Sequence, residues 1–415
     1  MLLDMNPRPD VCRTRLFILL LSLGVAVGAM PHADAQQVPD TGRIKLGETD
    51  LYPSIRLEYG INDNAYLETN NTEDTNRTSI KPRVVWLASQ RTTRLRAEYR
   101  GNFAIHSVSD LDYQNHYLDF RGSSVLGRQW RVAAAANYSR RSYDLGAERT
   151  VGQGRFFGEP FIFDDINLSA IGTFGANGAR GNLDFGIRMR QLEPQSLEEE
   201  SGDFAYTRIA PFALFSLRLS GDTRLTFETR FSEYDYDLDS RDRSEAAFLV
   251  GARFAATGRL TGSFDVGVSS VSSDNDQTDG TSDLIASAEL GYSLTEAALF
   301  TLTGQRRIDN ATAFNAAEGD GRIRNTVRLQ WDQEYSSRVS HEAYVQSEIV
   351  DRSCPSRSSS EAEFGYQLGV SVRRWVQLGG FYRNRSRSFD NCPGEFEGDI
   401  DYDNQRVGVF VELSL

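Results

Sequence analysis

The stretch that decides the fold is RVGVFVELSL, residues 406–415. Every second residue in it is apolar: Val407, Val409, Val411, Leu413 and Leu415. The residues between them are mostly polar or small, and this period of two predicts a β-strand with one oily face. A soluble sheet that covers a core on one side has such strands. A barrel in lipid has them too, with the apolar face outward and the polar face inward.

The remainder of the chain favours the barrel. From Leu51 onward, segments with the same period are separated by two kinds of connection that alternate along the sequence. Short turns such as 89–92 and 127–129 alternate with long polar loops such as 195–203 and 392–399. Bacterial outer-membrane barrels have short turns at the periplasmic rim and long loops at the extracellular rim. We therefore predict an all-β, antiparallel, up-and-down transmembrane barrel of about 18 strands, with about 16 as the alternative count.

Tryptophan supplies a second argument for the barrel. Trp86, Trp130, Trp331 and Trp375 each lie within a few residues of a short turn. Because indole side chains collect at membrane–water interfaces, we interpret the four as an aromatic girdle at the inner rim. A β-sandwich would not sort its connections by side, and a propeller would show an internal repeat of about 40–50 residues that the sequence lacks.

The N-terminal 35 residues have the composition of a secretory signal. Three arginines precede an apolar run of 15 residues, 16–30, and Ala33-Asp34-Ala35 matches a cleavage site. The alternative, an anchoring helix, needs about 20 apolar residues. We expect a signal peptide over 1–35, a short periplasmic N-terminal segment over 36–50 and the barrel over 51–415.

Charge and hydropathy narrow the location and the partners. The later sequence has no apolar segment long enough for a spanning helix, and closed barrels are the other architecture that satisfies the backbone in lipid. The formal net charge of −13 argues against a nucleic-acid partner. The sequence therefore predicts a protein of the outer membrane of a Gram-negative bacterium, in contact with outer-membrane lipid.

The inward face of the predicted strands is rich in arginine. The candidate anion-contacting residues are Arg96, Arg100, Arg121, Arg188, Arg190, Arg224, Arg230, Arg322, Arg324, Arg328, Arg383 and Arg385. Inward acids are fewer, so the acidic excess lies in the loops. Guanidinium groups bind carboxylate or phosphate and would bias a pore toward anions. The alternative is a set of arginine–acid ladders that brace the wall. Segment 206–219 is apolar on both faces, so its parity stays open.

The longest predicted loop, 143–165, carries four phenylalanines: Phe156, Phe157, Phe161 and Phe163. A loop with this much apolar surface has no reason to lie in water. One expectation is that it folds into the lumen as a constriction and offers sugar rings an aromatic surface. The alternative is a loop that packs on the rim or on itself.

Few residues point to covalent chemistry. Cys354 and Cys392 fall in the last two long loops, which are separated by one hairpin, so we expect an extracellular disulfide. The three histidines of the mature chain belong to no catalytic triad or metal-spaced cluster. The loop 274–280 has three aspartates suited to calcium, although a solvated surface loop explains them better. We predict a protein that is not an enzyme, with no catalytic residues, metal or cofactor.

Two stretches resemble a known family. YGINDNAYLETNNTEDTNRTSIKPRV (59–84) resembles its opening G-x-x-D-N hairpin and S-x-x-P strand, and DLDYQNHYLDFRGSSVLG (110–127) resembles its D-x-D-Y-x-x-H second loop. This is the putative β-barrel porin 2 family, whose outer-membrane barrels occur with exopolysaccharide biosynthesis operons. The resemblance implies passage of a secreted polysaccharide across the outer membrane, and it carries no catalytic residues. A periplasmic polysaccharide export protein is an implied partner.

Our leading functional hypothesis is an outer-membrane channel that exports an anionic exopolysaccharide from the periplasm to the cell surface. The alternatives are a general diffusion porin for small anionic solutes and a surface-exposed structural or adhesion barrel. The terminal strand resembles the C-terminal signal that the barrel assembly machinery recognises, which makes that machinery a further expected partner. That signal usually ends in an aromatic residue, whereas this chain ends in Leu415.

Overall fold

The computed structural model describes residues 43–67, 72–108, 111–143, 161–176, 178–195, 205–237, 242–273, 281–309, 322–352, 357–390 and 401–414. The first part of this range forms a short strand, β1 (Ile44–Leu46), which pairs with the start of the next strand. The described part of the chain contains no helix that is long and apolar enough to cross a membrane.

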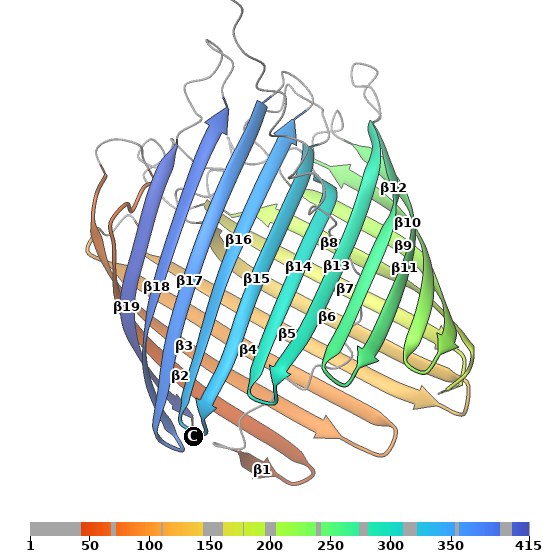
Figure 1. The fold of residues 1–415 in the computed structure, drawn as a ribbon, viewed down its shortest axis with the longest axis horizontal. Coiled ribbons are helices and arrows are strands. Elements are labelled where there is room, and N and C mark those ends of the chain that lie inside the picture. Colours follow the sequence, from red (N-terminus) through yellow and green to blue (C-terminus); the bar gives the residue numbers. More distant parts are fainter. Residues whose placement is uncertain are drawn as a thin grey trace, which may run out of the picture.

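The main body is a closed antiparallel barrel of 18 strands, as predicted (Figure 1). Its strands are β2 (Thr49–Asn62), β3 (Thr75–Ser89), β4 (Thr93–His106), β5 (Tyr113–Leu126), β6 (Trp130–Tyr143), β7 (Phe161–Phe174), β8 (Gly181–Pro194), β9 (Tyr206–Ser220), β10 (Thr223–Tyr236), β11 (Arg243–Thr257), β12 (Leu260–Ser273), β13 (Thr281–Thr295), β14 (Ala298–Asp309), β15 (Arg322–Ser336), β16 (Val339–Arg352), β17 (Arg357–Arg373), β18 (Val376–Asp390) and β19 (Tyr402–Ser414).

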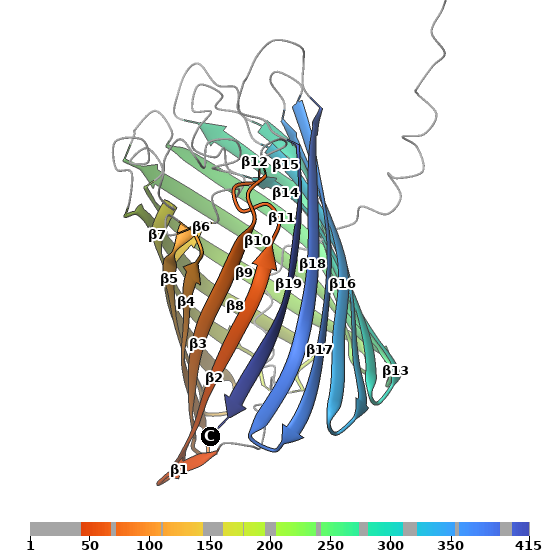
Figure 2. The same ribbon diagram turned by 90° about the vertical axis from the view of Figure 1, so that its left-hand side faces the viewer.

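Each strand pairs with its neighbours in sequence, and β19 pairs with β2 to close the cylinder. Figure 2 shows β19 beside β2, with β1 and the C-terminal end at the same rim. Val407 and Val409 on β19 are 53% and 60% exposed, whereas Phe410, which has the opposite parity, is 2% exposed. The alternation in the final segment therefore has its valines on the outer surface and its other residues on the inner one, as expected for a barrel in lipid.

The connections sort by rim largely as predicted. Two-residue turns such as 221–222, 258–259 and 296–297 join the strands at the rim that holds β1. The difference in length is not strict, because the connection 353–356 at the opposite rim has four residues while the turn 175–180 has six. All four tryptophans lie in or near the turns of the first rim, and Trp130 and Trp375 are well exposed on the outer surface.

The G-x-x-D-N stretch lies at the seam where the two ends of the barrel meet. The Asp63 carboxylate accepts a hydrogen bond from the Gln405 backbone N–H at 2.6 Å, and the Asn64 side chain donates to the Asp403 carbonyl at 2.9 Å. Gly60 pairs with Gly408 across the same seam. A Cβ on Gly60 would lie 2.8 Å from the Val407 carbonyl oxygen, so both positions need glycine for the strands to approach this closely.

Two predicted boundaries shift. The first barrel strand begins at Thr49, two residues before the expected start at Leu51. The predicted loop 143–165 is shorter than expected, because β7 begins at Phe161. Phe163 faces the lumen near the end of a strand and does not follow the simple rule of apolar residues outward, so the sequence pattern of this segment resembles a loop.

Candidate functional site in the barrel lumen

The functional surface of a barrel is its inner face, and the strand register identifies it. Large apolar side chains that are well exposed, such as Leu118 and Phe120 on β5 or Phe227 and Phe231 on β10, mark the outer face. Residues of the opposite parity face the lumen. By this criterion all twelve predicted arginines occupy inward positions, although the side chain of Arg322, the first residue of β15, lies outside the described part of the structure.

Nine of these arginines form ion pairs with carboxylates of the barrel wall. They are Arg96, Arg100, Arg121, Arg190, Arg230, Arg324, Arg328, Arg383 and Arg385. The Arg383 and Arg385 pairs are bidentate, with Nε and Nη2 each 2.7–2.8 Å from oxygens of Glu363 and Glu361. Such pairs are the stronger charge-assisted kind. The bracing role of the lumen arginines is therefore visible in the contacts.

The two partners of many pairs differ in their exposure. The Arg100 side chain is 57% exposed and the Arg121 side chain 53%, whereas their partners Glu98 and Asp119 are only 9% and 13% exposed. Arg383 shows the same contrast with Glu363, at 45% against 7%. The carboxylates lie against the wall while the guanidinium groups project toward the lumen. A pair that is neutral as a whole therefore presents a cationic surface to anything inside the pore.

The contrast is not universal around the barrel. Arg230 and Arg324 are slightly more buried than their carboxylate partners, and Glu342 is slightly more exposed than Arg328. Arg328 also lies over the Tyr344 ring, with its Cζ atom 3.9 Å from the ring centroid. The exposed cationic surface is thus concentrated on part of the circumference, including β4 and β5.

Arg188 and Arg224 form no ion pair with a carboxylate in the part of the chain that the structure describes. Arg188 lies over the ring of Phe212 at 4.1 Å. Phe212 and Leu214 face inward on β9 and are 8% and 5% exposed, which settles the parity of the segment 206–219. The same parity places Arg208 in the lumen, where it donates to the Ser232 hydroxyl at 2.8 Å.

Sequence reasoning missed Arg208, although a signal for it existed. Arg208 and Arg218 are an even number of residues apart, so both lie on one face of the strand. A charged side chain on the lipid face costs free energy. These two arginines would therefore have oriented a strand whose apolar residues could not.

The expected constriction loop is only partly within the described residues. Phe163 belongs to β7, where its side chain faces inward and is completely buried, so it is part of the wall and not of a loop. Phe161 is the first residue of the same strand, and Phe156 and Phe157 lie outside the described residues.

Cys354, Cys392 and the acidic loop 274–280 also lie outside the described residues. Within the described residues, His, Cys, Asp and Glu form no group that could hold a metal ion.

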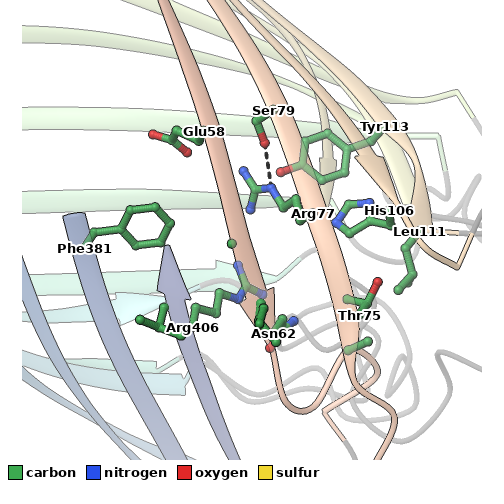
Figure 3. A pocket seen from close by; sticks show the side chains of 14 residues that line it. Glu58, Asn62, Thr75, Arg77, Ser79, His106, Leu111, Tyr113, Phe381 and Arg406 are labelled. Atoms are coloured by element: carbon green, nitrogen blue, oxygen red, sulfur yellow. Dashed lines mark hydrogen bonds between the residues drawn. The ribbon is translucent and has the colours of Figure 1, made fainter. Parts of the chain in front are cut away.

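A recess in the lumen wall lies near the seam, where β18, β19, β2, β3, β4 and β5 adjoin (Figure 3). Its empty volume of about 650 Å³ includes open solvent, and its lining includes Glu58, Arg77, His106, Tyr113 and Phe381. The Arg77 Nε atom donates to the Ser79 hydroxyl at 2.8 Å, and its guanidinium lies 5.6 Å from the centre of the Tyr113 ring. The recess thus combines a cation, an anion and aromatic faces on one inner surface.

A closed antiparallel barrel with an apolar outer surface and an arginine-rich inner surface defines an outer-membrane channel protein. Residues 205–414 match the family described as Putative beta-barrel porin 2, and the chain belongs to this family. The protein is accordingly located in the outer membrane of a Gram-negative bacterium, as the sequence predicted. The family indicates a channel rather than an enzyme.

The chain is similar to several solved structures at low identity. The apoprotein form of the FrpB iron transporter from Neisseria meningitidis (F5-1 variant) is 8% identical, with a TM-score of 0.46 over 88% of this chain and 81% of that chain. OpdO of Pseudomonas aeruginosa is 13% identical, with a TM-score of 0.46 over 89% and 97%. A bacterial polysaccharide outer membrane secretin is 8% identical, with a TM-score of 0.35 over 88% and 98%. No curated protein sequence matches the chain.

Proposed function

We propose that this barrel is the outer-membrane exit channel for an anionic exopolysaccharide. The observation that carries the proposal is the unequal exposure within the lumen ion pairs, in which guanidinium groups project inward and carboxylates lie against the wall. Exposed guanidinium groups favour carboxylate or phosphate groups of a passing chain. The family's association with exopolysaccharide operons is the reason for proposing a polymer as the cargo.

The experiment is deletion of the gene in its natural host, with complementation by the wild-type gene. We expect loss of extracellular polysaccharide and its accumulation in the periplasm, both reversed by complementation. The nearby genes give a second readout, since glycosyltransferases and a chain-length regulator beside this gene would accompany an export role. Unchanged extracellular polysaccharide in the deletion strain would count against export.

A diffusion porin for small anionic solutes is the second candidate, because the same exposed guanidinium groups would favour small anions. Growth of the deletion strain on a limiting organic acid distinguishes the two functions. A growth defect with normal polysaccharide supports the porin, and lost polysaccharide with normal growth supports export. A barrel with only a structural or adhesive role would give no ion conductance in a planar bilayer.

Two further proteins belong to this proposal. A periplasmic polysaccharide export protein would deliver the chain to the rim that holds β1 and the two-residue turns. The barrel assembly machinery would recognise β19, whose outward residues are apolar at alternate positions. Co-purification of the detergent-solubilised barrel with the export protein after cross-linking would test the first partner.

A further inference from the structure

The inner face of β3, β4 and β5, here called the β3–β5 wall, carries a concentration of positive charge that the bracing of the barrel does not require. Arg83 on β3 pairs in register with Arg100 on β4, and Arg96 on β4 pairs in register with Arg121 on β5. Like charges directly opposite each other on neighbouring strands destabilise a sheet. Two such pairs lie on this wall, in inward rows separated by the row of Glu98 and Asp119.

One glutamate is shared by three of these arginines. The Glu98 carboxylate lies between the two rows, 2.8 Å from Arg83 Nε, 2.5 Å from Arg96 Nη2 and 3.5 Å from Arg100 Nε. The fourth, Arg121, pairs with Asp119 at 2.9 Å. Four guanidinium groups thus face two carboxylates, which leaves an excess of two positive charges (4 − 2) on the described residues of this cluster.

The excess charge is accessible from the lumen. Arg100 and Arg121 are the most exposed lumen arginines among the ion pairs given above, while Glu98 and Asp119 are largely covered. Asp119 also accepts a hydrogen bond from the Asn137 side chain, which helps to hold it on the wall. The cluster therefore has unused donor capacity toward the lumen, because each guanidinium carries five N–H donors.

Tyrosine rings continue the surface toward the extracellular rim. The Arg100 guanidinium lies 5.4 Å from the centre of the Tyr117 ring, and the Arg77 guanidinium lies 5.6 Å from that of Tyr113. Tyr113 and Tyr117 are four residues apart on the same face of β5, or about 13 Å along the strand. The second of these arginine–tyrosine pairs lines the recess of Figure 3. An arginine thus lies against a tyrosine ring at two points along the wall.

We propose that the β3–β5 wall is a binding track for a linear polysaccharide whose sugars carry carboxylates. Arg83, Arg100 and Arg121 bind the carboxylates, and the ring faces of Tyr113 and Tyr117 support the sugar rings. This inference rests on the proposed export function and specifies its cargo. A single bound anion would need only the cluster around Glu98, whereas a chain explains why the paired arginines and tyrosines extend along the wall.

The test is block of the ion current through the purified full-length barrel in a planar bilayer. A decamer of galacturonate added from the short-turn side is expected to reduce the wild-type current. In the double variant Arg100→Gln/Arg121→Gln, we expect the half-blocking concentration to rise about tenfold, which is the loss of about 1.4 kcal/mol of binding. Arg140→Gln is the matched control, because Arg140 faces outward on β6 and is ion-paired with Asp164 at 2.9 Å.

Two further arms make the result specific. Arg100→Lys/Arg121→Lys keeps the charge but removes the bidentate geometry, so its half-blocking concentration is expected between those of the wild type and the glutamine variant. Neutral maltodecaose and monomeric galacturonate should block far less than the decamer. The track is refuted if the glutamine and control variants block equally, or if the neutral decamer or the monomer blocks as well as the acidic decamer.

Failure of the track and failure of the export function are distinguishable. The block experiment uses purified protein and does not depend on what the cell secretes. If the deletion strain loses its polysaccharide but replacing Arg100 and Arg121 does not change the block, the binding track is refuted and the export function is retained. If the block depends on Arg100 and Arg121 but the deletion strain secretes polysaccharide normally, the wall binds anions and the export function is refuted.

Discussion

Asn404 holds the barrel closed at the point where its first and last strands meet. Its side chain is 3% exposed and donates hydrogen bonds to the Asn62 side chain and to the Asn64 carbonyl oxygen, the latter at 2.7 Å. Asn64 in turn donates to Asp403. Single side chains matter here because β19 and β2 are joined by no covalent turn, so the seam depends on its register hydrogen bonds and on this small network.

Replacing Asn404 by alanine should therefore open the seam more easily. The substitution removes two buried hydrogen bonds that the Asn404 side chain donates, which costs about 1–3 kcal/mol of unfolding free energy. The measurement is urea-induced unfolding of the barrel in detergent, followed by the mobility difference between folded and unfolded forms on a gel. Asn76→Ala, an exposed position on the neighbouring hairpin, is the control. Equal midpoints for the two variants would show that the Asn404 network adds nothing to closure.

The arginines show how far residue-level prediction reaches. Their inward orientation follows from sequence, since a cation on the lipid face is costly and the period of a strand fixes every second residue. Their exposure does not follow from sequence. That Glu98 is covered by Arg83, Arg96 and Arg100 depends on cross-strand register, which brings Arg83 opposite Arg100. The cationic surface of the lumen is therefore a property of the folded wall.

At the scale of elements, the strands were easiest to predict where their two faces differ in polarity. β17 and β19 alternate clearly, whereas β9 places Phe212 and Leu214 inward and Ile209 and Phe215 outward. Those inward residues are covered by neighbouring side chains, among them Arg188, and so behave as a small apolar core on the wall. Local packing of this kind overrides the rule that apolar residues face outward, and it cannot be predicted from the sequence of a single strand.

Glu98 is one of the two carboxylates that balance the arginines of the β3–β5 wall. Changing Glu98 to glutamine removes the counter-ion that Arg83, Arg96 and Arg100 share. Because these arginines are partly exposed, solvent screening reduces the cost, and we expect a loss of about 1–3 kcal/mol of unfolding free energy. In about 1 M salt the Debye length falls to about 3 Å, so the loss should shrink.

Unfolding in urea at low and high salt measures this effect, with Glu342→Gln as the matched control. Glu342 is an inward glutamate on β16 that contacts Arg328 at 3.5 Å and is 40% exposed. Its replacement should change the stability little, because exposed pairs contribute little. A Glu98→Gln protein as stable as the control at low salt would mean that the arginine rows tolerate their own repulsion.

For the whole molecule, the distribution of charge along the barrel axis is more informative than the net value of −13. The nine connections at the rim opposite β1 contain 25 acidic and three basic residues, a net charge of −22 (3 − 25). The lumen-facing wall exposes arginine instead. A lumen that exposes arginine thus leads to a strongly acidic extracellular end. Composition gave the acidic total, but the position of the strands was needed to separate the two zones.

Two zones of opposite charge in series should make the channel rectify. When the extracellular side is positive, cations enter from the acidic end and anions enter from the arginine-lined end, so both accumulate inside and the current is large. The opposite voltage depletes both ions and the current falls. The favoured direction for anions is outward, which suits an exporter.

Current–voltage curves of single oriented channels at low salt measure the asymmetry, which should disappear near 1 M salt as the Debye length shortens to about 3 Å. Glu198→Gln/Glu199→Gln/Glu200→Gln should weaken the rectification from the acidic end, and Arg100→Glu/Arg121→Glu should weaken it from the lumen. Symmetric curves for the wild-type channel at low salt would show that the two zones do not act in series on the same ion path.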